Sequence, residues 1–405
     1  MKQTIFLFII ITFLYSNQEG VFNVLDKDIN KVTISFENEE IRTEKLDNYD
    51  QFIGYKTLTI DNGLPELPKY TLNYGLDPSK NYEISYNIIN SHTINDVNIF
   101  PHQSVKKSNS EEVLGIYINS PYYNSYDTFP QEIIRDNRAT MRGNEIMMID
   151  IIPFSYSNSN KTLVVYDEIE IIIEEIGDRE APLSNFKRSK TFQNIYDNMV
   201  LDTFDDREID FQEPSILYIC GGSSQDYAYL DLLVDWRRKQ GYQVTTVNLT
   251  EIGGNSTTYV KNYIEDAYYN WENPPEFISL IGDASGSGNV PTVPTFIVGS
   301  GNGWQGASAE SDLPYVLLDD DLLADMLIGR ISIRSETEFS VVANKILGYE
   351  KLYAGLDWIE SVALVGDPYD SGISTVITNE YIAMIMENYG VEDINEHYTG
   401  QGSFD

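Results

Sequence analysis

A change of hydrophobic pattern near residue 214 limits the fold of this chain more than any other feature. Before it, apolar residues alternate with polar ones in short runs that end at Asn, Asp, Gly or Pro. After it, near-continuous apolar runs of strand length alternate with segments whose apolar residues recur every three or four positions. The first pattern is typical of antiparallel sheets and the second of a parallel sheet with crossover helices, so we expect two domains of different class.

The first half carries its strand pattern in four runs rich in β-branched residues, at residues 31–37, 82–89, 145–153 and 163–174. Strands of this kind, separated by turn residues, predict a β-sandwich. Residues 62–70 (NGLPELPKY) break the pattern, because Pro65 and Pro68 lack a backbone N–H and disfavour a central strand. This segment either lies in a groove as a substrate does or forms an exposed connector, and the residues alone favour the connector.

The second half predicts a doubly wound, mainly parallel sheet. Its strands are expected at residues 215–220, 242–249, 277–282, 326–333 and 362–365. Helices are expected to begin near Ser223, at Ser256 or Thr257 and at the capping box of Ser335 and Glu338, with another over residues 374–388. Ligands of such sheets bind at the carboxyl ends of the strands.

The charge balance excludes one class of partner. The chain has 27 Lys and Arg against 63 Asp and Glu, a net charge of −36. Nucleic acid attracts clustered Lys and Arg, so we expect no nucleic-acid partner. An acidic balance suits a protein outside the cell and suits cation binding, although most of these carboxylates are expected to form a solvated surface.

The amino terminus predicts export. An apolar run over residues 5–15 follows Lys2 and is too short to span a bilayer, so residues 1–19 are expected to be a signal peptide. The alternative is an uncleaved anchor. Apart from this run, no stretch is apolar enough to span a membrane, so we expect the mature protein to be secreted or at the cell surface, without a membrane span.

A cluster of aspartates lies directly before one predicted strand, at Asp319, Asp320, Asp321 and Asp325. In an extended segment Asp321, the Leu323 carbonyl and Asp325 point the same way, and Asp283 follows a neighbouring strand. Hard oxygen ligands with several negative charges suit Ca²⁺ better than Zn²⁺. The competing interpretation is an ordinary acidic turn, and the residues leave the two open.

The single cysteine, Cys220, closes an apolar strand and allows neither an intramolecular disulfide nor a cysteine-based zinc site. We interpret it as a buried, inert thiol in preference to a nucleophile. His92, His102 and His397 show no spacing typical of a metal site or a catalytic triad. The glycines after Cys220 lack the fingerprints of nucleotide-binding loops.

The second half resembles the gingipain family of cysteine peptidases, whose catalytic domain has a caspase-like fold. The resemblance is carried by residues 215–241, by 280–283, by the acidic stretch that runs into Ile328-Gly329-Arg330, and by residues 358 and 365–368. The first half resembles the prodomain of that family through residues 63–68 (GLPELP) and the strand pair of residues 145–174. Together these segments cover most of the chain after the predicted signal.

The resemblance implies several properties that the residues alone leave open. Asp283, Asp321, the Leu323 carbonyl and Asp325 correspond to a structural calcium site. The prodomain is expected to keep the peptidase latent, residues 62–70 to contact the catalytic cleft, and activation to require a cut near residues 187–190. By the same resemblance, Asp367 or Asp370 is expected to be an accessory acid of the catalytic site.

The resemblance also has gaps, because no Gly-His motif and no later strand ending in Cys corresponds to the family's dyad. We therefore expect a sequence truncated before its Cys/His dyad. The expected organisation is a signal (1–19), a β-rich prodomain (20–175), a linker (176–213), a first catalytic subdomain (214–357) and the start of a second (358–405). The expected function is that of a secreted cysteine endopeptidase precursor acting on proteins or peptides. The alternative is an exported, non-catalytic, calcium-dependent binding or surface-assembly protein.

Overall fold

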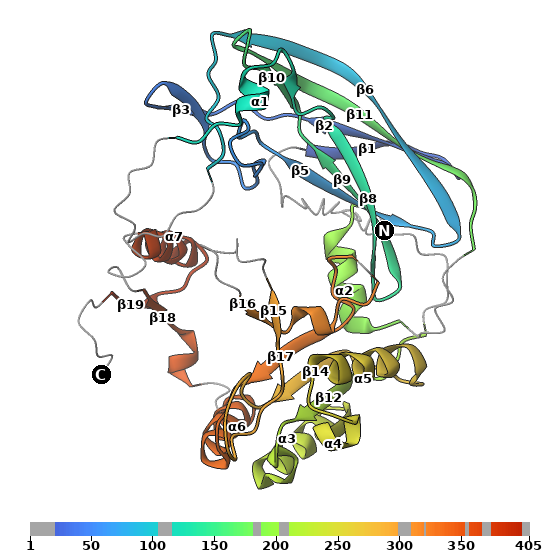
Figure 1. Ribbon diagram of the computed structural model, residues 1–405, viewed down its shortest axis with the longest axis vertical. Helices are drawn as coiled ribbons and strands as arrows, with labels where there is room; N and C mark the ends of the chain where they lie inside the picture. The colour runs from blue at the N-terminus through green and yellow to red at the C-terminus, as the bar shows by residue number, and fades with distance from the viewer. Residues whose placement is uncertain are drawn as a thin grey trace, which may run out of the picture.

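The chain folds into a strand-rich half and an α/β half joined in sequence near residue 210 (Figure 1). The structure is a computed structural model, and it describes residues 21–103, 116–180, 188–201, 210–298, 309–319, 321–352, 356–366 and 374–398. The predicted signal peptide, Asp320, Asp367 and Asp370 lie outside these ranges. In the described part of the chain, no helix combines the length and the apolar character needed to cross a bilayer.

Two antiparallel sheets form the first half. The larger contains β1 (Val21–Lys27), β2 (Lys31–Glu37), β11 (Thr162–Asp178), β10 (Phe154–Ser157) and β7 (Thr128–Phe129), with β6 (Lys80–Asn95) also paired to β11. The smaller contains β5 (Tyr70–Leu76), β9 (Asn144–Ile151) and β8 (Ile134–Met141), and a separate hairpin joins β3 (Thr43–Leu46) to β4 (Tyr49–Phe52). The four predicted strand runs fall within β2, β6, β9 and β11, apart from the last residues of the third.

The core of this half lies between the two sheets, as period-two alternation requires. Ile169, Ile171 and Ile173 of β11 point inward with the buried side chains of β2, and they meet Leu72 of β5 and Ile149 of β9. The intervening glutamates, such as Glu168 and Glu170, are only partly buried. The predicted β-sandwich is therefore confirmed.

Residues 62–70 belong to the sandwich. Leu67 is fully buried in a second apolar cluster of this half, and isolated bridges join Pro65 to Pro101 and Leu58 to Pro68. Lys69 forms an ion pair with Asp150 of β9 at 2.8 Å. These contacts all lie within the first half and show that the segment is not an exposed connector, whereas its expected contact with a catalytic cleft stays a prediction.

The predicted linker, residues 176–213, contains a packed helix, α2 (Lys190–Met199). Its start is well defined, because the side chain of Ser189 accepts a hydrogen bond from Phe192 N and donates one to Glu276. Phe192 and Tyr196 are buried against Met141 and Ile146 of the β8–β9 hairpin. A cut at residues 188–190 would fall at this buried helix start, which disfavours the expected processing point there; residue 187 lies outside the described ranges.

A four-stranded parallel sheet forms the centre of the second half (Figure 1). Its strand order is β13 (Gln243–Asn248), β12 (Ser215–Cys220), β14 (Phe277–Ile281) and β17 (Leu327–Ile331). The crossover from β12 to β13 contains α3 (Ala228–Lys239), that from β13 to β14 contains α4 (Leu249–Ile252) and α5 (Thr257–Asn270), and α6 (Glu336–Leu352) follows β17. The predicted α/β layout is confirmed, with each predicted strand of this sheet placed to within two residues.

Both faces of this sheet are covered, which is why its strands are apolar throughout. Leu217 and Ile219 of β12 face α5, where Val260 and Ile264 are fully buried. Ile216 and Tyr218 face the other way, toward Leu233 of α3 and the side chains of α6. Alternation along one strand therefore fills two cores.

The helix starts were predicted with mixed success. Ser256 caps α5 by accepting a hydrogen bond from Tyr259 N, as expected. Ser223 makes no side-chain cap, because a 3-10 turn at Ser224–Asp226 precedes α3 and delays the helix to Ala228. At α6 the Ser335 hydroxyl accepts from Glu338 N as predicted, but the Glu338 carboxylate accepts from Arg334 N, one residue earlier than a capping box requires.

The described part of the chain contains several further elements. They are α1 (Ser120–Tyr123), the antiparallel pair β15 (Phe296–Val298) and β16 (Ala309–Ser311), 3-10 turns at Leu313–Tyr315 and Asp357–Glu360, and the parallel pair β18 (Ser361–Val365) and β19 (Asp393–His397) with α7 (Ser374–Asn388) between them.

Candidate functional site: the two edges of the parallel sheet

The direction of the strands places the predicted calcium ligands at opposite ends of the sheet. β14 and β17 run parallel, with Phe277 beside Leu327 and Ile281 beside Ile331. Asp283 follows β14, at what we call the carboxyl edge, whereas Asp325 precedes β17, at the amino edge. Strands of this length separate the two edges by roughly 16 Å at about 3.3 Å per residue.

Asp283 is bound into the carboxyl edge. One of its carboxylate oxygens accepts hydrogen bonds from Ala284 N at 2.8 Å and from the Ser332 hydroxyl at 3.3 Å. The other oxygen lies 3.7 Å from the Arg334 guanidinium. Since Ser332 and Arg334 follow β17, this carboxylate ties the ends of two neighbouring strands together.

Asp321 and Asp325 instead share a set of backbone donors at the amino edge. The Asp321 carboxylate accepts from Thr140 N at 2.7 Å and, through its other oxygen, from Leu323 N at 2.7 Å. The Asp325 carboxylate accepts from Arg142 N at 2.9 Å and from Leu318 N at 3.1 Å. Thr140 and Arg142 belong to the first half of the chain.

These positions separate Asp283 from the other expected calcium ligands. Asp283 cannot join Asp321 and Asp325, and the oxygens of those two carboxylates already accept backbone N–H groups. Within the described ranges, no group of three or more His, Cys, Asp or Glu side chains is placed to hold a metal ion. Calcium binding by Asp321, the Leu323 carbonyl and Asp325 stays a prediction, and the geometry removes Asp283 from that set.

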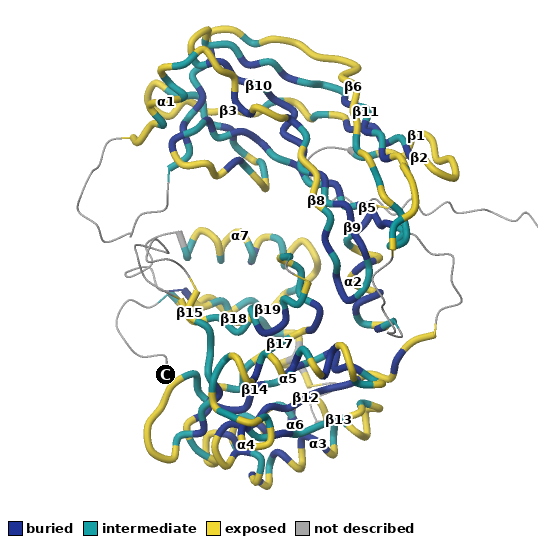
Figure 2. The backbone as a smooth tube through the Cα atoms, turned by 45° about the vertical axis from the view of Figure 1, so that its right-hand side comes forward, coloured by how far each residue is buried: buried dark blue, intermediate teal, exposed yellow. Residues whose placement is uncertain are grey.

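The hairpin formed by β8 and β9, which we call the docking hairpin, is the functional feature that sequence reasoning missed. It extends from the sandwich to α2 and the sheet of the second half, and buried positions continue to its end (Figures 1 and 2). Arg142, in its two-residue turn, is 8% exposed. The sequence signal that could have predicted this hairpin is an Arg-Gly pair at a turn between two alternating strands. That signal does not show which surface the arginine contacts.

The Arg142 guanidinium lies in a cup of oxygen atoms from the second half. Its Nη1 donates to the carbonyls of Pro275 at 3.0 Å and Asp325 at 2.9 Å. Its Nη2 donates to Gln212 Oε1 at 2.9 Å and to the Pro274 carbonyl at 3.1 Å. Gln212, Pro274 and Asp325 all precede strands of the parallel sheet, so the cup lies at the amino edge.

Aromatic rings close the cup on two sides. The guanidinium carbon lies 5.2 Å from the centre of the Phe192 ring and 5.6 Å from that of Tyr268. Such stacking favours a flat delocalised cation. Burial lowers the pKa of the Arg142 guanidinium, and the neighbouring Tyr268, Glu276 and Asp325 oppose that shift.

Burial also acts on Asp325, whose side chain is fully enclosed. It raises the pKa of the Asp325 carboxyl to about 7, and the nearby Asp319 adds to the shift, while the hydrogen bonds from Arg142 N and Leu318 N act against it. The carboxyl is therefore stabilised chiefly by donors that the docking hairpin and its own loop supply.

The carboxyl edge is organised by Arg330, the arginine of the Ile-Gly-Arg stretch. Its guanidinium pairs with both carboxylate oxygens of Asp312, at 2.7 and 2.8 Å. It also donates to the carbonyls of Gly282 and Val293. Burial by itself would raise the pKa of Asp312, but the hydrogen bonds from Arg330 and Thr295 hold it below its ordinary value.

Backbone segments approach one another closely at this edge. A Cβ on Gly221, which follows β12, would lie 2.5 Å from the Thr292 carbonyl oxygen. Only glycine fits there, so the loop of residues 283–295 is held against the ends of the strands. This is the edge at which ligands of doubly wound sheets bind.

The described residues contain no assembled nucleophile and base. Cys220 is fully buried, and burial raises the pKa of its thiol to about 12, so it is a poor nucleophile as expected. His92 pairs with Asp167 and His102 with Glu66, both inside the sandwich half. His397 lies in β19. The predicted accessory acids Asp367 and Asp370 fall outside the described ranges.

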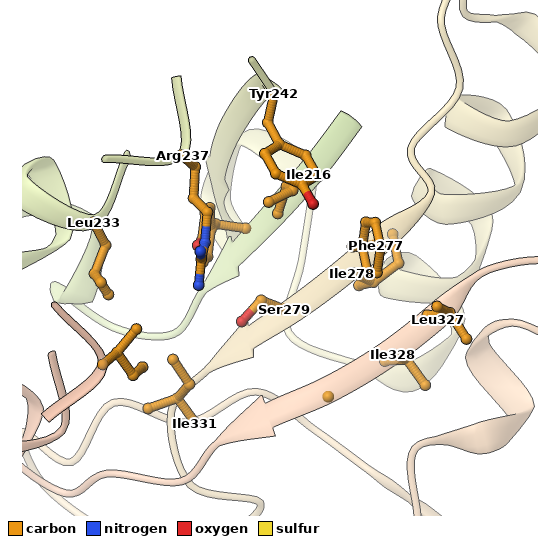
Figure 3. A pocket seen from close by; sticks show the side chains of 13 residues that line it. Ile216, Leu233, Arg237, Tyr242, Phe277, Ile278, Ser279, Leu327, Ile328 and Ile331 are labelled. Atoms are coloured by element: carbon orange, nitrogen blue, oxygen red, sulfur yellow. The ribbon is translucent and has the colours of Figure 1, made fainter. Parts of the chain in front are cut away.

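A hollow of about 420 Å³ opens on the sheet face beside α3 and α6 (Figure 3). Ile216, Phe277 and Ile331 give it apolar walls, and Arg237 reaches toward it from α3. The Arg237 guanidinium is bound to both oxygens of Glu350, at 2.6 and 2.8 Å. The hollow lies on a face of the sheet and away from the carboxyl edge, so we do not assign it as the catalytic site.

Comparison with known proteins decides which family this arrangement belongs to. The sequence model of Peptidase family C25 matches residues 209–403, and the model described as Propeptide_C25 matches residues 32–208. The chain belongs to peptidase family C25. Its sandwich half is the propeptide region, which we call the propeptide half, and its α/β half is the peptidase half. The boundary between the two matches falls inside the predicted linker.

The relatives are gingipains of Porphyromonas gingivalis. Gingipain R1 is 21% identical over 357 residues, which cover 84% of this chain and 34% of that protein. Gingipain R2 is 22% identical over 389 residues, covering 87% of this chain and 50% of that protein. This chain therefore spans at most half the length of these relatives. The resemblance to the gingipain family is confirmed.

Solved structures of the same family also match. The complex of the pro- and mature domains of RgpB from P. gingivalis shares 20% identity, with a TM-score of 0.36, over 44% of this chain and 96% of that chain. Gingipain R (RgpB), described as an Arg-specific cysteine proteinase, shares 19% identity, with a TM-score of 0.38, over 48% and 43% of the two chains. At these scores the superpositions add no argument to the family matches.

Proposed function

We propose that this chain is part of the precursor of a secreted cysteine endopeptidase that its own propeptide keeps latent. The observation that carries the proposal is the order of two contiguous matches, propeptide and then peptidase, along one chain. The docking hairpin supports it, because the propeptide half inserts a buried arginine into the peptidase half. Protein or peptide substrates follow from the same family membership.

The reaction proposed for the longer protein is acyl transfer. A cysteine thiolate attacks the peptide carbonyl, a histidine protonates the departing amine, and water then hydrolyses the acyl-enzyme. Cys220 is unsuited to this role because it is buried with a raised pKa. We therefore place the Cys/His dyad beyond residue 405, and the chain's span of at most half of its relatives leaves room for it.

An activity assay of two chains tests the proposal. We expect the 405-residue chain to show no thiol-dependent cleavage of protein substrates, and Cys220→Ala to be indistinguishable from it. A longer chain that contains the proposed dyad should cleave them after propeptide removal, and replacing the added cysteine by alanine should abolish cleavage. Cleavage by the 405-residue chain that disappears with Cys220→Ala would refute our assignment. A longer chain without a Cys/His pair would favour the non-catalytic binding protein.

Export is proposed from the amino-terminal apolar run alone. Residues 1–19 are expected to be removed during secretion, so the exported protein should begin near residue 20. Amino-terminal sequencing of the cell-free fraction checks this expectation. Retention of the apolar run in an extractable membrane fraction would show that it is an anchor.

A further inference from the structure

The turn of the docking hairpin has an unfavourable local conformation for its sequence. Met141 pairs with Asn144, so Arg142 and Gly143 form a two-residue loop. Both have positive φ, 47° at Arg142 and 74° at Gly143, as in a type I′ turn. Asn, Asp or Gly is the usual residue at the first position, and a long side chain there is strained. The local backbone does not account for an arginine at this position.

Contacts with the peptidase half do account for it. All four guanidinium hydrogen bonds of Arg142 end on oxygens that follow the propeptide match in sequence, those of Gln212, Pro274, Pro275 and Asp325. The neutral acceptors are two carbonyls before β14, one before β17 and one side-chain amide before β12. A forked planar donor can reach this many acceptors at once, whereas an ammonium group cannot.

The backbone of the same turn is also bound across the boundary. Thr140 N and Arg142 N donate to the carboxylates of Asp321 and Asp325, at 2.7 and 2.9 Å. The positive φ of Arg142 is the backbone conformation in which these hydrogen bonds are made. Side chain and main chain therefore dock as one unit, with the Phe192 ring on the propeptide side and the Tyr268 ring on the peptidase side.

We propose that Arg142 is the residue that holds the propeptide half on the peptidase half, so that the two stay associated after the chain between them is cut. The inference rests on the proposed function, which makes the halves propeptide and peptidase. It adds that retention is centred at the amino edge, roughly 16 Å at about 3.3 Å per residue from the carboxyl edge. Arg142 thus retains the propeptide without occupying the edge where substrates are expected.

The experiment cuts the full chain and measures whether its halves separate. A recognition sequence for a site-specific protease replaces residues 202–209, and the purified chain is cut and passed through a size-exclusion column. We expect the cut native chain to elute as one complex. Arg142→Ala should raise the dissociation constant of the cut halves about 100-fold or more, because buried arginines at interface centres dominate binding. Dilution-dependent elution reports that constant.

Arg135→Ala is the matched control. Arg135 lies on β8 of the same hairpin but is exposed, so its loss should leave the complex intact. Arg142→Lys tests the forked geometry, since it keeps the charge, and it should weaken the complex about 10-fold or more. A cut Arg142→Ala chain that stays together as tightly as the native one would overturn the proposal. A lysine variant that binds like the native chain would overturn the role of the fork.

Folding is checked on the uncut variants by hydrogen exchange of the β9 and β12 amides. If uncut Arg142→Ala does not fold, Gln212→Ala tests the proposal in its place. This variant removes one acceptor of the Arg142 guanidinium from the peptidase half and should weaken the complex about 10-fold. An unchanged dissociation constant for Gln212→Ala in that case counts against the proposal. The dissociation constant can be measured without any catalytic activity. A longer chain that lacks peptidase activity would therefore contradict the proposed function, but it would not affect the proposed role of Arg142.

Discussion

The two edges of the parallel sheet carry the same kinds of charged residue and use them differently. At the amino edge, Asp321 and Asp325 bind backbone groups of a distant hairpin, whose Arg142 comes from the other half of the chain. At the carboxyl edge, Arg330 and Asp312 come from the peptidase half itself and bind its own loops. The first edge thus joins two domains, and the second organises one. Acidic residues next to a strand do not by themselves show which of these roles they have.

Loss of Asp325 should have the largest effect on stability. Asp325→Ala removes the acceptor of the Arg142 and Leu318 backbone N–H groups. We expect the free energy of unfolding to fall by about 2–6 kcal/mol, at about 1–3 kcal/mol for each donor that is left without an acceptor. Guanidinium denaturation measures it.

Asp283→Ala is the control at the other edge. Its carboxylate lies 3.7 Å from an exposed arginine, so the loss should stay within about 1 kcal/mol. Equal losses for the two variants would contradict the difference between the edges.

Arg330→Lys should have the next largest effect. Lysine cannot pair with both oxygens of Asp312 while donating to the Gly282 and Val293 carbonyls. We expect a loss of about 2 kcal/mol in the free energy of unfolding. Arg334→Lys, at a side chain that is 66% exposed, should change stability by less than about 0.5 kcal/mol. Thermal melts of the two variants side by side make the comparison, and similar losses would show that Arg330 acts only as a charge.

The pairing of Asp312 predicts a pH dependence. Its pKa is held below the ordinary value in the folded chain, so the unfolded state binds the proton more readily. The contribution of the pair is fully present above the unfolded pKa of about 3.9 and is lost as the pH falls through the folded pKa. Native protein should therefore lose more stability than Asp312→Asn in urea titrations as the pH falls from about 5 to below the folded pKa. Parallel curves for the two proteins would exclude this role.

The smallest expected effect is a change in calcium affinity. A calcium titration also distinguishes the two edges most directly. If Ca²⁺ binds Asp321, the Leu323 carbonyl and Asp325, Asp321→Asn should weaken binding in a calorimetric titration. Asp283→Asn should leave the titration unchanged, because Asp283 lies at the other edge. Weakening by both variants would mean that the edges meet in a conformation other than this one. Identical titrations of native protein and Asp321→Asn would remove the site.

Local patterns were sufficient where the answer depends on neighbours in sequence. The apolar run of β12 predicted a buried strand, and the helix of residues 374–388 was predicted with the bounds of α7. The inert character of Cys220 also followed from its place in such a run. The linker was misjudged because its polar composition hid a helix that buries only Phe192, Gln193 and Tyr196.

By itself the sequence determined the two fold classes, the family, the strands of the parallel sheet and four strands of the sandwich, because hydrophobic period and short motifs are local properties of a chain. The tertiary structure alone decided that Asp283 and Asp325 lie at opposite edges, since that depends on the parallel register of β14 and β17. It alone decided that Arg142 meets Gln212 and the strand starts of the other half. Such contacts depend on how two domains pack, and residues far apart in sequence give no local sign of it.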